Sequence, residues 1–219
     1  MLSDRHIDGS RLSLEDVLAR LQASEGVTRR RSNEDAEQEE LIEEERNEWV
    51  RGDKPLTPAA VLVPLVVRED RLNVMLTKRT EHLKNHAGQI SFPGGRVDDN
   101  DRDAQHTALR ETEEEVGLHS RHIEIIGELD EYIVGTGYLV NPIIGVIEPP
   151  FELTPQEDEV AEIFEAPLDF LIHPENFERF AREFNGQTRH HFAITWQDYF
   201  IWGATAGMLR NLSQRLLSD

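Results

Sequence analysis

A helix that carries carboxylates along one face limits most strongly what this chain can fold into. Residues 103–116 have helical periodicity, which Gly117 ends. Because a helix advances about 100° per residue, Glu111, Glu114 and Glu115 stand at i, i+3 and i+4 and fall within one arc of about 100°. The neighbouring arc is modestly apolar and contains Ala108, Leu109, Thr112 and Val116. We therefore expect this helix to lie on a sheet through its apolar arc.

Stacked carboxylates destabilise an isolated helix by roughly 0.3 kcal/mol for each like-charged pair. A bound divalent cation reverses the sign of that interaction. Mg²⁺ prefers hard oxygen ligands and commonly binds a few carboxylates together with substrate phosphate oxygens. The ordinary alternative is a solvated acidic face, since the chain has 43 Asp and Glu residues against 23 Lys and Arg. The sequence before the helix favours the metal site.

A glycine turn and an acidic loop precede the carboxylate helix. Residues 93–95 read Pro-Gly-Gly, and the two glycines leave the backbone open to approach a metal or a phosphate. The loop that follows contains Asp98, Asp99 and Asp101. Residues 110–118 then read Arg-Glu, any pair, Glu-Glu, any residue, Gly and an aliphatic residue. The combined pattern resembles the Nudix box and is far more specific than any of its parts.

The resemblance implies the Nudix fold, in which a mixed sheet is sandwiched between helices and the carboxylates of the box helix face a cleft. It implies Mg²⁺ or Mn²⁺ ions held by Glu111, Glu114 and Glu115, with a backbone carbonyl of Gly94 or Gly95. The ions would neutralise a diphosphate while a metal-bound water of lowered pKa attacks one phosphorus.

The resemblance also assigns the remaining catalytic groups. Arg110 is expected to bridge to an acid in the preceding loop and so to orient the box. Glu114 and Glu159 are both candidates for the general base, and geometry has to choose between them. The box departs from the usual pattern in two places, because Thr112 replaces a bulky aliphatic residue and a longer loop puts Asp101 near an expected Glu.

The segment before the glycine turn refines the substrate. Residues 76–80 read Leu-Thr-Lys-Arg-Thr, and residues 92–95 read Phe-Pro-Gly-Gly. This stretch is similar to the extra signature of the coenzyme A pyrophosphatase branch of Nudix enzymes. Its cations would supply local positive charge to a polyanionic substrate. The alternative is that they only neutralise nearby acidic residues such as Glu81. The expected substrate-binding residues are Arg79, Lys84, His86 and Gln89.

Hydrolysis of coenzyme A or an acyl-CoA is therefore the implied reaction. Its products would be adenosine 3′,5′-bisphosphate and 4′-phosphopantetheine or its acyl derivative. The alternative substrate is ADP-ribose or another nucleoside diphosphate derivative. A second alternative is a catalytically silent nucleotide-binding module, but a silent site has no need to retain the repulsion among its carboxylates.

Apolar runs and turn residues outline the rest of the fold. Strands are predicted at residues 59–67, 72–78, 88–92, 123–129, 140–147 and 191–196. Helices are predicted at residues 13–23, where Ser13 and Asp16 form a capping box, and at residues 202–216. Because strands and helices interleave, the fold class is α/β or α+β with a mixed sheet. The Nudix domain is placed at residues 55–219, after an acidic, largely helical extension at residues 1–54.

Four other segments have mainly structural interpretations. The acidic residues 157–162 could add a ligand or base, with a solvated loop as an equal alternative. Residues 135–137 predict a turn, since the third glycine of a dinucleotide fingerprint is absent. His190 and His191 are adjacent on a predicted strand and so point to opposite faces. The aromatic residues at 199–202 are expected in the core and not as a base-stacking platform.

Composition narrows the function classes. The net charge of −20 argues against binding nucleic acid or an anionic membrane through the overall field. The chain contains no Cys, which excludes disulfides, thiolate zinc sites and thiol nucleophiles. No apolar run approaches the roughly 20 residues of a membrane span, so we expect a cytoplasmic protein. The expected partner is a coenzyme A-like nucleotide diphosphate, with a homodimer as a further option.

Overall fold

The computed structural model describes residues 11–23, 30–32, 55–69, 71–83, 86–184 and 187–217. The strands of the main sheet are β1 (Arg30–Ser32), β2 (Thr57–Arg68), β3 (Arg71–Arg79), β4 (Ile90–Ser91), β5 (Gly94–Arg96), β6 (Ile123–Glu128), β7 (Glu131–Val134), β8 (Tyr138–Ile147) and β9 (Val160–Pro167). They follow the order β1-β7-β8-β2-β3-β4, while β5 pairs with β2, β6 with β8 and β9 with β3.

Four α-helices and a small second sheet complete the described part of the fold. The helices are α1 (Leu14–Ala23), α3 (Ala104–Val116), α4 (Leu168–Ile172) and α5 (Ala204–Leu217). The second sheet is antiparallel and consists of β10 (Glu178–Phe184), β11 (Gln187–Trp196) and β12 (Tyr199–Trp202). Among the residues that the structure describes, no helix is long and apolar enough to cross a membrane.

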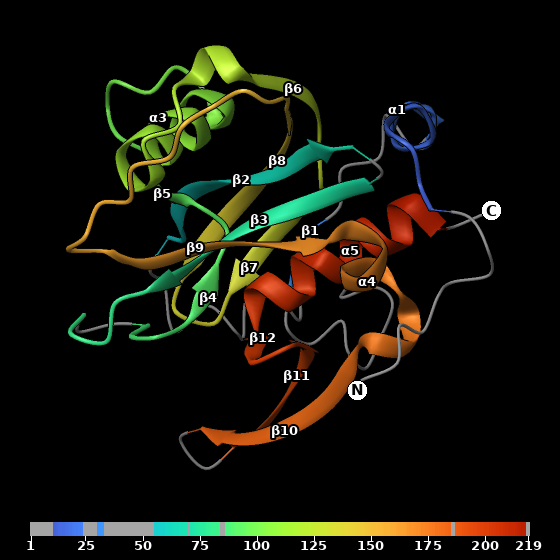
Figure 1. Ribbon diagram of the computed structural model, residues 1–219. Coiled ribbons are helices and arrows are strands. Elements are labelled where there is room, and N and C mark those ends of the chain that lie inside the picture. The colour runs from blue at the N-terminus through green and yellow to red at the C-terminus, as the bar shows by residue number, and fades with distance from the viewer. Residues whose placement is uncertain are drawn as a thin grey trace.

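Strand β2 forms the centre of the main sheet and is buried on both faces. It runs parallel to β8 and antiparallel to β3 and β5. Since alternate side chains of a strand go to opposite faces, Ala60 and Leu62 pack with Ala108 of α3, whereas Val63 and Leu65 join the larger core. Helix α3 covers one face of the sheet, and α4 and α5 cover the other (Figure 1). The predicted fold class, a mixed sheet between helices, is confirmed.

Helix α3 has the boundaries that local sequence signals predict. The carboxylate of Asp103 accepts a hydrogen bond from the backbone N–H of His106 and caps the first turn. Gly117 ends the helix in a left-handed conformation with φ of 71°, and its N–H donates to the carbonyl of Glu113. A side chain there would also meet Thr154, whose atoms lie 2.9 Å from the position of an added Cβ.

Two segments before residue 55 belong to the fold. Helix α1 begins after Ser13, whose backbone N–H donates to Asp16 over 2.9 Å, so the predicted capping box is confirmed. Val17 and Leu21 of this helix are buried in the main core. Strand β1 pairs in parallel with β7. The acidic segment at residues 34–50 lies outside the described residues, and the domain boundary near residue 55 stays a prediction.

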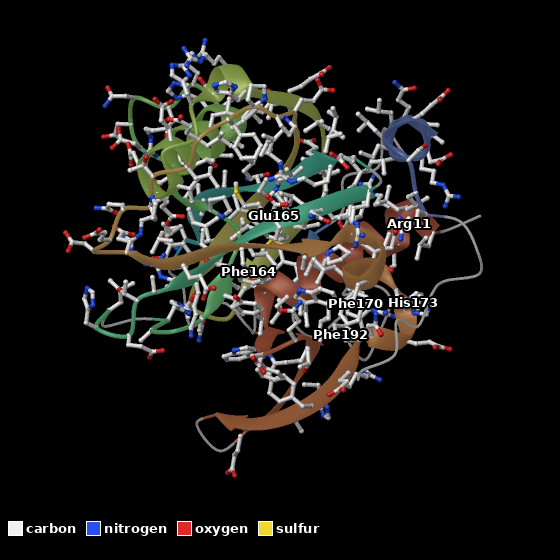
Figure 2. The ribbon with its side chains drawn as sticks, viewed as in Figure 1. Arg11, Phe164, Glu165, Phe170, His173 and Phe192 are labelled. Atoms are coloured by element: carbon white, nitrogen blue, oxygen red, sulfur yellow. The ribbon has the colours of Figure 1, made fainter. Side chains whose placement is uncertain are left out.

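The structure differs from the sequence prediction in the C-terminal third. Of the acidic residues at 157–162, those at 157–159 lie in a turn, but Glu162 lies on β9, which pairs with β3, so the alternative of a solvated loop is wrong for Glu162. Phe164 and Glu165 are neighbours on β9 (Figure 2). Phe164 stacks on Tyr199, whereas Glu165 accepts hydrogen bonds from Arg68 and Asn73. The helix predicted from residue 202 begins at Ala204 because the preceding residues pair with β11.

The aromatic residues of β12 are divided between three environments. Tyr199 packs on Phe164, and Ile201 beside it is fully buried. Phe200 is 48% exposed, so its predicted place in the core is wrong. Trp202 packs against the rings of Phe180 and His191 and lines a cavity. The alternation along a short strand that has one face on the core explains this division.

Candidate active site

The carboxylates of α3 differ in exposure although they share one arc. The side chain of Glu115 is 6% exposed and that of Glu111 is 18% exposed, whereas that of Glu114 is 59% exposed. The arc next to them is fully buried through Ala108, Thr112 and Val116. The helix therefore lies on the sheet as predicted, with its carboxylates at the edge of the contact.

Thr112 is accommodated in this buried arc by a local hydrogen bond. Its hydroxyl donates to the carbonyl of Ala108, one turn earlier, over 2.6 Å. A buried hydroxyl that has a partner avoids most of the cost of desolvation. The residue can therefore stand where the usual pattern has an aliphatic side chain.

The glycine turn lies directly against the carboxylates. A Cβ built on Gly95 would overlap the carboxylate of Glu111, so the absence of a side chain makes this contact possible. The backbone N–H of Gly94 donates to Oε2 of Glu115 over 3.3 Å. Residues from β5 and α3 are thereby brought into one site, as the box resemblance implies.

Asp101 holds Arg110 and the start of α3 together. The Nε and Nη2 atoms of Arg110 donate to its two carboxylate oxygens over 3.0 and 2.9 Å, so the expected bridge to the preceding loop is present. Asp101 also accepts from the hydroxyl of Thr107 and contacts Nδ1 of His106, both at 2.9 Å. The hydrogen bonds from Arg110 hold the pKa of this carboxyl well below its usual range. Asp101, which stands near the position where the usual box has a Glu, thus holds Arg110 in place.

Arg110 also reaches the carboxylate face. Its Nη1 lies 3.0 Å from Oε1 of Glu111 and 3.2 Å from Oε2 of Glu114. Both glutamates are therefore held on the side of the helix that carries Arg110. Among the described residues, no three His, Asp or Glu side chains are arranged around one point as ligands of a metal ion. The metal ligand set remains a proposal that depends on the chemistry of the donors.

Arg79 at the end of β3 joins the box to a second acidic loop. Its Nη1 lies 3.5 Å from Oε1 of Glu115, and its Nη2 lies 3.5 Å from Oε2 of Glu159. The loop is held in place by the backbone N–H of Thr80, which donates to the carbonyl of Glu159 over 3.0 Å. The structure thus brings together two candidate site residues, Glu115 and Glu159, that are far apart in the chain.

The buried carboxylates have unusual proton affinities. Burial raises the pKa of Glu115 to about 7, and repulsion from Glu111 and Glu159 adds to the effect of burial against the opposing charge of Arg79. Burial also raises the pKa of Glu111, although Arg110 opposes the shift. Hard oxygen donors that are partly desolvated and lack full charge compensation fit a divalent cation.

A cavity of about 390 Å³ opens beside this site. Its lining includes Gly94 and three of the expected substrate-binding residues, Arg79, His86 and Gln89. Nδ1 of His86 lies 2.7 Å from the amide oxygen of Gln89, so these two side chains are coupled. Lys84, the fourth expected residue, lies outside the described residues.

The opposite wall of the cavity comes from segments that sequence reasoning did not assign to a site. It contains His191 of β11, Trp202 of β12, and Ala204, Thr205 and Met208 of α5. The small residues at 203–206 leave space at the start of α5, which is the sequence signal that could have indicated a cavity. Only the packing of β12 and α5 near β4 brings this wall to face Arg79.

Comparisons with known proteins agree with the box and the fold. The NUDIX domain family matches residues 56–185. The uncharacterized Nudix hydrolase NudL of Escherichia coli strain K12 is 40% identical over 158 residues, which cover 72% of this chain and 82% of the relative. NudL of Shigella boydii serotype 4 has the same identity and coverage. A crystal structure of a Caenorhabditis elegans Ap4A hydrolase binary complex is 20% identical, covers 51% of this chain and 80% of its own, and has a TM-score of 0.45.

Proposed function

The chain belongs to the Nudix hydrolase family, and from that premise we propose that it hydrolyses the diphosphate bond of coenzyme A or an acyl-CoA. The products would be adenosine 3′,5′-bisphosphate and 4′-phosphopantetheine or its acyl derivative. One observation carries the proposal: Arg79, from the segment similar to the coenzyme A branch, contacts Glu115 of the box and also lines the adjoining cavity. A substrate whose diphosphate lies at the box would therefore extend past Arg79 into the cavity.

The metal site is proposed at Glu111, Glu114 and Glu115, with the backbone of Gly95 beside them. A bound Mg²⁺ or Mn²⁺ would supply positive charge to the diphosphate and lower the pKa of an attacking water. The contact between Gly95 and Glu111 and the only partly compensated burial of Glu115 support this donor set. Arg110, which is held by its hydrogen bonds to Asp101, would keep these donor groups in position.

The remaining polar groups have proposed roles that follow from their positions. Arg79 would bind phosphate oxygens, and His86 with Gln89 would bind the substrate at the entrance of the cavity. We favour Glu159 as the general base, because Glu114 is a proposed metal ligand, whereas Glu159 lies outside that set on the loop beside Arg79. Lys84 stays a predicted phosphate contact.

Product analysis tests the proposed function directly. Purified protein would be incubated with Mg²⁺ or Mn²⁺ and coenzyme A, ADP-ribose, NADH or diadenosine polyphosphates, and the products would be identified by chromatography and mass spectrometry. We expect coenzyme A to be cleaved well ahead of the others. Faster cleavage of ADP-ribose would leave the pyrophosphohydrolase assignment and remove the coenzyme A assignment. Binding without any cleavage would favour a silent nucleotide-binding module. A cytoplasmic location and a homodimer stay predictions from the sequence.

A further inference from the structure

The cavity beside Arg79 is lined on its opposite wall by Trp202, Ala204 and Met208, and these residues define an apolar end that the diphosphate chemistry does not require. Resting on the proposed function, we propose that this apolar end binds the pantetheine arm and the first carbons of an acyl group. We also propose that residues 202–208 determine which acyl chains the enzyme accepts. The nucleotide half of the substrate would then remain outside the apolar end.

The position of the cavity supports this assignment. It shares Gly94 and Arg79 with the proposed metal site, and both residues contact Glu115. A diphosphate at the carboxylates would therefore have one of its two substituents at the cavity entrance. The volume of about 390 Å³ lies in the range of small-molecule sites.

The lining favours an uncharged chain. Both walls are largely apolar, and they include Val61, Phe92, Val140, Trp202, Ala204 and Met208. Among the described lining residues, Arg79 is the only Lys or Arg, and none is Asp or Glu. A phosphate placed deep in such a cavity would lose its hydration without a compensating charge. The 3′-phosphate and the adjoining ribose therefore fit the open side of the site better than the apolar end.

Two hydroxyl groups of the lining, those of Thr205 and Ser91, have partners within the protein. The hydroxyl of Thr205 donates to the carbonyl of Ile90 over 3.0 Å, and the hydroxyls of Ser91 and Thr77 lie 3.2 Å apart. These groups offer little directional recognition to the ring nitrogens and amino group of a base. An acyl chain and the methylene groups of the pantetheine arm make no such demands.

The wall that faces the sheet lies beyond the shared family domain. The family match ends at residue 185, whereas His191 and residues 202–208 supply the opposite side of the cavity. The proposed chemistry thus lies within the matched domain, whereas the proposed selection of the chain depends on residues that follow it. Each methylene buried against this wall would raise kcat/KM by roughly fourfold until the cavity is filled.

A chain-length series on two variants tests the proposal. Hydrolysis of coenzyme A and its acetyl, butyryl, hexanoyl and octanoyl thioesters would be compared for the wild type and for Ala204→Leu, which fills the cavity from α5. Ala181→Leu adds the same side chain at an exposed position of β10 and is the matched control. We expect Ala204→Leu to lower kcat/KM at least tenfold for the longest accepted chain and much less for coenzyme A, while Ala181→Leu matches the wild type.

Measuring the binding of each product by itself distinguishes a failure of the pantetheine assignment from a failure of the proposed function. Calorimetry should show that Ala204→Leu lowers the affinity for 4′-phosphopantetheine and leaves the affinity for adenosine 3′,5′-bisphosphate unchanged. If Ala204→Leu does not fold, Thr136→Trp at the exposed turn lining the cavity provides the same obstruction. Two results would overturn the assignment of the cavity to the pantetheine arm while leaving coenzyme A hydrolysis in place. One is that Ala204→Leu weakens the binding of adenosine 3′,5′-bisphosphate instead, and the other is that it affects all members of the acyl series equally. Failure of the wild type to cleave coenzyme A or any of its thioesters would overturn the proposed function itself.

Discussion

Arg79 Nη1 lies 3.5 Å from Oε1 of Glu115, so the end of β3 and the carboxylate face of α3 meet through one ion pair. The same guanidinium lies 3.5 Å from Oε2 of Glu159 through Nη2 and lines the cavity. One side chain therefore connects the proposed metal ligands, the candidate base and the proposed substrate site.

Replacing Arg79 tests its contact with substrate phosphate. We expect Arg79→Gln to raise KM for coenzyme A by roughly tenfold, the scale of a lost charged hydrogen bond. The rise should be larger for coenzyme A than for 3′-dephospho-coenzyme A if the guanidinium contacts the additional phosphate. Arg121→Gln, at an exposed arginine of a separate turn, serves as the control. Equal increases in KM for both substrates would remove the 3′-phosphate contact.

The raised pKa of Glu115 has a consequence for stability. The folded state favours the protonated carboxyl, so ionisation of Glu115 costs stability as pH rises from about 4.5 through the folded pKa of about 7. Glu115→Gln imitates the protonated form. In the presence of EDTA, we expect its Tm to exceed that of the wild type by roughly 3 °C at pH 8 and to match it below pH 4.5.

The same substitution should abolish most of the activity. We expect Glu115→Gln and Glu114→Gln each to lower turnover by orders of magnitude while both proteins stay folded, as judged by circular dichroism. Glu113→Gln, on the exposed side of the same helix, is the matched control. Wild-type rates in a folded Glu115 variant would end the metal assignment.

Metal binding should depend on pH through the same group. A proton must leave Glu115 before its oxygens can bind a cation, so the affinity for Mn²⁺ should rise from pH 5 and level off above the pKa of about 7. Titration calorimetry in several buffers would measure both the affinity and the protons released. If the affinity of Glu115→Gln for Mn²⁺ depends on pH as steeply as that of the wild type, another group controls this pH dependence.

Asp101 should be more important than its neighbours in the loop. Asp101→Asn removes a carboxylate whose side chain is 1% exposed and leaves Arg110 without its main partner. We expect a loss of about 2 kcal/mol in the free energy of unfolding, below the full value of a buried pair because Arg110 is partly exposed. Asp99→Asn, at an exposed residue of the same loop, should have little effect.

The pH dependence of this effect has the opposite sign to that of Glu115. Arg110 holds the pKa of Asp101 below its usual range, so the ion pair stabilises the fold above about pH 4. The stabilisation is lost as pH falls through the lowered pKa. The free energies of unfolding of the wild type and Asp101→Asn should therefore differ most at neutral pH and become equal in strong acid. A constant difference across this range would assign the effect to packing instead.

Gly95→Ala tests the close contact between the turn and the box. The added methyl group would overlap the carboxylate of Glu111, which must then move away from the turn. We expect a large loss of kcat with little change in Tm, because the end of a flexible side chain can shift. Gly127→Ala is the control, since an added Cβ there would have its nearest neighbour, in Leu21, at 3.9 Å. Full activity in Gly95→Ala would show that the contact is dispensable.

Local features of the site were predictable from the sequence because they act over one or two helical turns. Asp103 and Gly117 define α3 through hydrogen bonds to residues at most four positions away. The bridge from Arg110 to Asp101 spans nine positions and was expected from the box. The arc of carboxylates follows from helix geometry alone.

The family, the mixed α/β class and the carboxylate helix could be predicted from the sequence, since periodicity, caps and the box involve contiguous residues. Three features follow only from the packing of distant segments: residues 160–167 form a strand, Arg79 lies between Glu115 and Glu159, and residues 202–208 close a cavity. These features join residues far apart in the chain. Strand pairing and cavity shape depend on which distant surfaces pack together. The conformational preferences of short segments do not determine that packing.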